Sequence, residues 1–290
     1  MPNKNILVPV GFSDQSLIAL GQAVNLAKKM NAKITLLAVV EESNTLFGLF
    51  GEDKDALKEH TQKIRKNLEG LAEEYSKSGV EFDVLTASGV VYEEISRAAT
   101  NIDAKFIVMG TDGRPGNISK RFIGSNAYRT VTSAPCPVIT IKGSEHREGL
   151  ERIVLPLDLE KETKQKVNHC IALAKLFNAE VHIISVLTSD DEFLRNTLKR
   201  NIRSVETFIK GKSVKCVAKL VSPEKGQDLS RAVIQYGKEI DADLIMIMTQ
   251  EENQITEFFL GSAAQSIIYH SRMPVMSIRP KSKDVVYDLP

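Results

Sequence analysis

The sequence has little of what disulfide-bonded, metal-binding or membrane-spanning proteins contain. Its 290 residues include no tryptophan, five histidines and only three cysteines, Cys136, Cys170 and Cys216, which lie far apart. An odd, scattered set of cysteines argues against a disulfide framework, and no Cys or His pair has zinc-site spacing. No run approaches the roughly 18 apolar residues of a membrane helix, and the N-terminus has no signal-peptide layout. We therefore expect a cytoplasmic protein with no membrane partner and no metal centre of its own.

The chain also lacks an excess of charge of either sign. It has 38 basic and 37 acidic residues, a net charge of +1, which gives no general reason to expect nucleic acid as a partner. The hydrophobic content is 42%, enough for one large or two ordinary domains.

What the chain does have is an internal repeat of domain length. Four segments of the first half recur in the same order in the second half, which predicts a duplicated domain. We expect domain 1 at 1–143, a polar linker at 144–150, domain 2 at 151–280 and a tail at 281–290. The matched pairs are 5–14 with 152–161, 31–40 with 178–187, 102–110 with 240–248, and 134–142 with 271–279.

Each half alternates apolar strand-like runs with segments of helical spacing. In domain 1 the strands are expected at 6–10, 33–40, 80–86, 106–110 and 138–142, and the helices at 13–30, 53–77, 92–102 and 125–134. Ser13 or Asp14 can cap the first helix. Alternation of this kind predicts an α/β fold: two tandem, open, twisted parallel sheets with right-handed crossovers and helices on both faces, a Rossmann-like architecture. Ligands of such sheets lie beyond the carboxyl ends of the strands, where the strand order reverses.

The loop after the fourth strand of domain 1 is rich in glycine and positive charge. Residues 110–125 read GTDGRPGNISKRFIGS, with three basic residues including Arg114 and one acid, Asp112, a net charge of +2. Glycine lets consecutive backbone N–H groups converge on an anion, and a helix N-terminus favours negative charge. The counterpart at 249–262 has three acids and no base, a net charge of −3. A phosphate would be attracted to the first loop and repelled by the second, although a lone glycine pattern is more often a simple turn.

The motifs ILVPVGFSD, GTDGRPGNISKRFIGS and APCPVITIK, in this order, resemble the universal stress protein family in its tandem form. The resemblance implies a five-stranded parallel sheet per domain, of the adenine-nucleotide alpha-hydrolase-like type. It also implies a stress-response protein that is no enzyme beyond slow ATP hydrolysis, with ATP bound in the branch that keeps the glycine motif. By the motif Gly110, Gly113, Gly124 and Ser125 would line the phosphates. The backbone of Val39 would meet the adenine.

Three departures from the ATP-binding pattern leave the nucleotide open. Ten residues separate Gly113 from Gly124, one more than in the family. Asp112 would repel phosphate unless a Mg²⁺ ion bridges the two. Gly11 stands where the family's ATP binders keep an aspartate that holds the ribose or base, whereas domain 2 has Asp158 there but no glycine loop. We read domain 1 as a weakened site and domain 2 as a structural partner.

Other candidate sites have mostly structural interpretations. Large apolar side chains in the loop 45–51 are either a lid or protein contact, or the first packed turn of the next helix. Cys136 is expected to be buried, and His182, within a strand, to be a hydrogen-bonded core or edge residue. His169 and Cys170 are adjacent on a helix and point about 100° apart, so they do not form a nucleophile pair. No spacing indicates a catalytic constellation. The apolar side chains of the loop are Leu46, Phe47, Leu49 and Phe50.

The last strand of each half is a candidate edge strand, and an exposed edge invites pairing with another strand. In the family the final strands often pair between domains, so the resemblance implies a covalent pseudo-dimer; a homodimer of two chains stays open. Two further functions also stay open. One is a scaffold without nucleotide that recruits an unidentified protein or a small ligand. The other is a nucleotide-dependent transferase or ligase, which lacks its activating loop here.

Overall fold

The computed structural model describes residues 4–41, 54–111, 125–142, 149–157, 163–223, 228–251, 258–259 and 261–280. Domain 1 and domain 2 each provide five strands and four helices to this part, and domain 2 adds a two-stranded ribbon, β10 (Gln250–Glu251) with β11 (Phe258–Phe259). The elements of domain 1 are β1 (Asn5–Pro9), α1 (Asp14–Met30), β2 (Lys33–Val40), α2 (Lys54–Ser76), β3 (Phe82–Ser88), α3 (Val91–Asn101), β4 (Ala104–Gly110), α4 (Ser125–Ser133) and β5 (Val138–Ile141). Those of domain 2 are β6 (Arg152–Pro156), α5 (Thr163–Phe177), β7 (Glu180–Val186), α6 (Glu192–Gly211), β8 (Cys216–Val221), α7 (Leu229–Glu239), β9 (Leu244–Met248), α8 (Ser262–His270) and β12 (Val275–Ile278).

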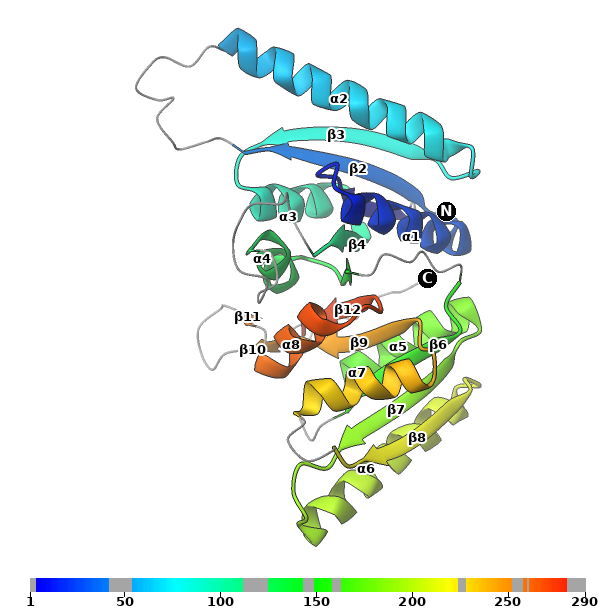
Figure 1. Cartoon of the computed structure of the whole chain (residues 1–290). Coiled ribbons are helices and arrows are strands. Elements are labelled where there is room, and N and C mark those ends of the chain that lie inside the picture. Colours follow the sequence, from blue (N-terminus) through cyan, green and yellow to red (C-terminus); the bar gives the residue numbers. More distant parts are fainter. Residues whose placement is uncertain are drawn as a thin grey trace.

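The strands of both domains form one continuous sheet. Its order is β3-β2-β1-β4-β5-β12-β9-β6-β7-β8, so the five parallel strands of each domain join at β5 and β12 (Figure 1). This is the pairing of last strands that the family resemblance implies. Within each domain the order reverses beside the first strand, between β1 and β4 and between β6 and β9. These are the two places where a parallel sheet of this kind presents a ligand crevice.

The junction has an approximate two-fold axis. β5 and β12 are antiparallel, with Val138 opposite Ser277, Ile139 opposite Met276 and Thr140 opposite Val275. Since Ile139 and Met276 are equivalent positions of the two halves, the axis passes through this pair. An antiparallel pair of equivalent strands is what a symmetric dimer makes, here between two halves of one chain.

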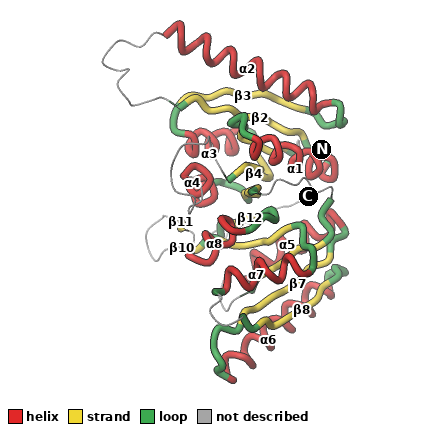
Figure 2. Tube along the Cα trace, viewed as in Figure 1, coloured by secondary structure: helices red, strands yellow, loops and turns green. Residues whose placement is uncertain are grey.

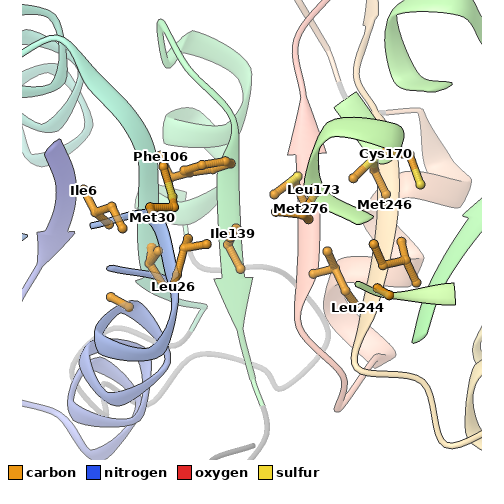
Figure 3. Close-up of a cluster of buried hydrophobic side chains, with 14 of the residues drawn as sticks. Ile6, Leu26, Met30, Phe106, Ile139, Cys170, Leu173, Leu244, Met246 and Met276 are labelled. Atoms are coloured by element: carbon orange, nitrogen blue, oxygen red, sulfur yellow. The ribbon is translucent and has the colours of Figure 1, made fainter. Parts of the chain in front are cut away.

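Helices cover both faces of the sheet, as the alternating pattern predicts (Figure 2). One face packs side chains of α1, α2, α5 and α6 against the strands, and the other packs those of α3, α4, α7 and α8. Each of these two cores contains residues of both domains. Ile139 of β5 and Met276 of β12 are both buried in the first core, which crosses the junction (Figure 3). The two domains therefore share a hydrophobic interior and are not independent units joined only by the linker.

Local signals in the sequence explain where several elements begin and end. The Ser13 hydroxyl accepts a hydrogen bond from the Ser16 N–H and caps α1, as predicted. Asn31 follows α1 with a φ of 50°, and Asp103 and Asp241 take φ values of 49° and 51° in the turns before β4 and β9. Asn and Asp tolerate this left-handed conformation better than most residues. Both aspartates thus form the turn from a helix to the following strand.

Candidate functional site

A parallel sheet of this strand order places its ligand crevice where β1 and β4 end side by side in domain 1. Thr111 follows β4, is 3% exposed, and donates its N–H to the Ile141 carbonyl at 3.0 Å. This bond fixes the point at which the glycine-rich loop leaves the sheet. Gly11 follows β1 on the other side of the crevice and is exposed. A Cβ added to Gly11 would meet no atom within 4 Å, so the site has room for the side chain that this position lacks.

Val39 presents its backbone to the same crevice. The Val10 N–H donates to the Leu37 carbonyl at 2.8 Å, whereas the Gly89 N–H donates to Val40 on the opposite side of β2 at 3.0 Å. Alternate residues of a strand direct their backbone groups to the same neighbour. Val39 therefore points its N–H and C=O as Leu37 does, toward the side of β1, which ends at Pro9. Backbone groups that lie beyond the end of a neighbouring strand point past that strand, toward the position where a planar base could bind.

Gly110 permits a close approach between β4 and α1. A Cβ at Gly110 would lie 3.0 Å from Gln15 Cβ and 3.1 Å from the Gln15 carbonyl carbon, tighter than most real Cβ contacts. A side chain here would therefore need the start of α1 to shift by a few tenths of an ångström, so packing favours glycine at this position whatever the loop binds. Ser125 opens α4 and is exposed. The other predicted contacts, Asp112, Gly113, Arg114 and Gly124, lie outside the described residues, as do Asp158 and the apolar loop 45–51.

The equivalent crevice of domain 2 differs in the described residues as well as in its loop. Thr249 donates its N–H to the Ile278 carbonyl at 2.9 Å, which repeats the anchor of Thr111. The Ser185 hydroxyl, however, donates to the Leu157 carbonyl at 2.7 Å. In domain 1 the two positions are Ala38 and Val10, and Ala38 has no hydroxyl to make this bond. In domain 2 a crevice carbonyl thus accepts a hydrogen bond from the side chain of Ser185. The equivalent carbonyl of domain 1 cannot accept one from Ala38.

Comparison with known proteins assigns the family. The family model described as the universal stress protein family matches twice, at residues 2–142 and 149–279. The chain belongs to the universal stress protein family. A universal stress protein of Methanocaldococcus jannaschii is 35% identical over 144 residues, covering 48% of this chain and 82% of that protein. One of Bacillus subtilis is 28% identical over 145 residues, covering 47% of this chain and 97% of that protein.

A solved structure confirms the tandem fold of this universal stress protein. The crystal structure of a universal stress protein from Archaeoglobus fulgidus superimposes with a TM-score of 0.78 over 96% of this chain and 99% of the other, at 22% identity. This likeness shows the fold alone. It agrees with two family domains in one chain, each with a mostly parallel sheet.

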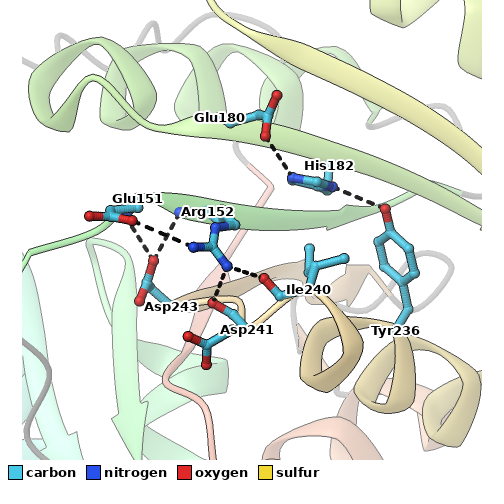
Figure 4. A network of polar contacts seen from close by, with 8 residues as sticks. All are labelled: Glu151, Arg152, Glu180, His182, Tyr236, Ile240, Asp241 and Asp243. Carbon is cyan, nitrogen blue, oxygen red and sulfur yellow. Dashed lines mark hydrogen bonds and ion pairs between the residues drawn. The ribbon is translucent and has the colours of Figure 1, made fainter.

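A polar cluster of this universal stress protein lies inside domain 2, between β7 and α7 (Figure 4). His182 on β7 is 8% exposed and contacts Tyr236 Oη at 3.0 Å through Nδ1 and Glu180 Oε2 at 3.1 Å through Nε2. Burial, followed by the charge of Glu180, raises the pKa of Tyr236. A phenol with a raised pKa is a poor nucleophile or base at neutral pH. The cluster satisfies a buried histidine, as the sequence predicts.

The cysteines are structural in the same sense. All three are buried, and burial raises the pKa of the Cys216 thiol to about 12. Burial also raises the pKa of Cys170, so His169 and Cys170 do not supply a thiolate. Within the described ranges, no group of three or more His, Cys, Asp or Glu side chains is placed to hold a metal ion. Over the same ranges no helix is both long and apolar enough to cross a bilayer.

Three residues of the crevice region were not predicted from the sequence. Gln15, Lys142 and Ser185 acquire their roles from partners distant in the chain: Gln15 bonds a residue 127 positions away. A lone Gln or Ser in an amphipathic segment carries no signal of such a contact. The contrast of Ala38 with Ser185 was visible in the aligned halves, but its meaning depends on the position of the Leu157 carbonyl.

Proposed function

We propose that this universal stress protein binds an adenine nucleotide, ATP with Mg²⁺, in the crevice of domain 1 and not in that of domain 2. The charge difference between the two loops carries the proposal: +2 over 110–125 against −3 over 249–262. Bound nucleotide would bias a conformation or a protein contact, with at most slow hydrolysis. In this proposal the protein is cytoplasmic and no group is transferred.

The described geometry supports this assignment. Val39 directs its backbone groups toward the open end of β1, where a base would lie. Gly110 and Thr111 leave the sheet from a fixed point beside it, and Ser125 begins the helix whose N-terminus favours phosphate. By the family motif the phosphates would contact Gly110, Gly113, Gly124 and Ser125, with Arg114 adding charge and Asp112 reaching the metal ion. Domain 2 lacks this set and fills one crevice carbonyl with Ser185.

A thermal-shift titration with Mg-ATP tests the proposal. At 100 times Kd, binding should stabilise the native protein by about 2.7 kcal/mol. Gly113→Asp should abolish the shift, because a side chain and a negative charge enter the loop. The matched control is Gly70→Asp on an exposed stretch of α2, where a Cβ meets no atom within 4 Å. A wild-type response as flat as that of Gly113→Asp would remove the nucleotide from the account.

The second candidate function is a scaffold that binds no nucleotide, and Gly11 is the observation that favours it. The ATP-binding branch keeps an aspartate at this position, and the open space around Gly11 admits one. Under the nucleotide proposal Gly11→Asp should therefore tighten Mg-ATP binding, by about tenfold for one hydrogen bond to a charged group. If neither wild type nor Gly11→Asp binds Mg-ATP, the scaffold function is the better description.

A further inference from the structure

The first residues of the domain 1 loop are held by a short line of contacts that ends in domain 2. It begins at Gly110, against which the first turn of α1 packs. A Cβ placed on Gly110 would lie 3.0 Å from Gln15 Cβ. The Gln15 side chain continues from that turn: its Nε2 donates to the Lys142 carbonyl at 2.6 Å. Thr111 donates its N–H to Ile141, the residue before Lys142. Two successive carbonyls, that of Ile141 at the end of β5 and that of Lys142 after it, thus bond Thr111 and the Gln15 side chain beside Gly110.

Lys142 carries the line across the domain junction. Its ammonium group donates to the Tyr269 carbonyl and lies 3.6 Å from the centre of the Tyr269 ring. Tyr269 belongs to the last turn of α8, where unpaired carbonyls and the helix dipole favour a positive charge. The cation–π contact adds to this attraction. Only two side chains, Gln15 and Lys142, therefore separate Gly110 from the last helix of domain 2.

The line is not repeated in the other direction. Arg279, the equivalent of Lys142, donates to the Ser133 carbonyl at the end of α4 at 3.0 Å, so each domain's last helix is held by a basic side chain of the other. The equivalent of Gly110, however, is Met248, which has a Cβ and packs into the core. At this position, the close approach of a helix to a glycine is present in domain 1 and absent from domain 2. Gln15 also keeps a buried Oε1 with no partner among the described residues.

We propose that Gln15 and Lys142 are positioning residues that fix Gly110 and Thr111, the start of the domain 1 loop, and tie them through Tyr269 to α8. This inference rests on the proposed function and assigns domain 2 a role: nucleotide binding in the domain 1 crevice changes the stability of α8. The physical reason is that a ligand that contacts Gly110 restricts the Gln15 side chain packed against it and, through its hydrogen bond, the backbone of Lys142. Coupling of this kind is reciprocal, so changes at the Lys142–Tyr269 contact also change nucleotide affinity.

Hydrogen exchange of the full-length protein, read by mass spectrometry on peptides covering 262–270, tests the tie. Without nucleotide, Gln15→Leu in domain 1 should already speed exchange of the α8 amides, on the order of fivefold. With saturating Mg-ATP, the wild type should slow exchange in α8. Gln15→Leu and Lys142→Met should each lose that slowing and weaken ATP binding, while the double variant should be no worse than the more affected single one. Lys142→Arg should restore both properties.

The matched control is Arg152→Met. Arg152 also donates from a basic side chain to carbonyls at the end of a helix, those of Ile240 and Asp241, but both partners lie within domain 2 (Figure 4). It should leave the response of α8 to Mg-ATP unchanged. The tie is overturned if Mg-ATP binds but α8 exchanges as before, with Gln15→Leu equal to wild type. If Gln15→Leu alters α8 while no variant binds Mg-ATP, the tie stands and the nucleotide proposal fails.

Discussion

At the scale of single residues, the duplicated halves solve the same packing problem with different pairs. A Cβ added to Gly237 on α7 would lie 2.8 Å from Met273 Cε and 3.0 Å from Met273 Sδ. The equivalent positions of domain 1 are Ala99 and Cys136, both buried. A glycine faces a methionine in domain 2, whereas domain 1 has an alanine and a cysteine at the same two positions. Because the two positions are close in domain 2, we expect that their residues are not interchangeable one at a time.

The effect of Gly237→Ala should therefore depend on its partner. In the wild type we expect little net change in the free energy of unfolding, because moving the flexible end of the Met273 side chain costs roughly 1 kcal/mol and the better helix former returns about 1. In a Met273→Cys background the same change should stabilise by about 0.5–1 kcal/mol, since only the helix term remains. Urea unfolding of the wild type, Gly237→Ala, Met273→Cys and the double variant measures both changes in the free energy of unfolding. Equal effects in the two backgrounds would show that the two side chains do not compete for space.

At the scale of elements, α7 and α3 are equivalent helices with different caps. Asp228 caps α7: its Oδ1 accepts from the Arg231 N–H at 2.8 Å and from the Ser230 hydroxyl at 2.6 Å. The Ser230 hydrogen bond, followed by that of the Arg231 N–H, lowers the pKa of Asp228. The N-cap of α3 is Val90, which makes no side-chain cap bond. The cap of α7 should thus stabilise its helix in a pH-dependent way.

Asp228→Ala should cost about 1 kcal/mol of unfolding free energy at pH 7, typical of a lost N-cap. Because the pKa of Asp228 is lower in the folded than in the unfolded protein, its ionised form stabilises the fold above the unfolded value of about 3.9. This contribution is lost as the pH falls through the folded pKa. Chemical unfolding of wild type and Asp228→Ala between pH 7 and pH 3 should show the difference shrinking toward acid. A difference that grows toward acid would contradict the assignment of Asp228 as the cap. Conversely, Val90→Asp in α3 should increase the free energy of unfolding by about as much as Asp228→Ala decreases it.

Element positions could largely be predicted from the sequence, because apolar spacing reports burial directly. The strand at 33–40 matches β2, and most other limits differ by one or two residues. The β10–β11 ribbon was missed, since two residues per strand leave no periodic pattern. The contacts of Gln15 and Lys142 could not be predicted either, as each partner lies 127 residues away. The family motif named Gly110 as a ligand contact, but only the structure shows that Gln15 packs close enough to favour a glycine there.

At the scale of the molecule, the protein is a dimer of universal stress domains built into one chain. The antiparallel β5–β12 pair and two shared cores join the halves, and Lys142 and Arg279 each bond the last helix of the opposite domain. Covalent linkage lets the two halves diverge, since each copy no longer has to serve on both sides of the axis. The two crevices differ in this way: their loops have net charges of +2 and −3, and domain 2 has Ser185 at the position of Ala38 in domain 1.

This account predicts asymmetry, and the stoichiometry of Mg-ATP binding by isothermal titration calorimetry tests it most directly. We expect one nucleotide per chain in the wild type and none in Gly113→Asp, because domain 1 has the basic glycine loop, whereas domain 2 has an acidic loop and a crevice carbonyl bonded by Ser185. Two nucleotides per chain, or one that persists in Gly113→Asp, would show that domain 2 binds and would contradict the central claim.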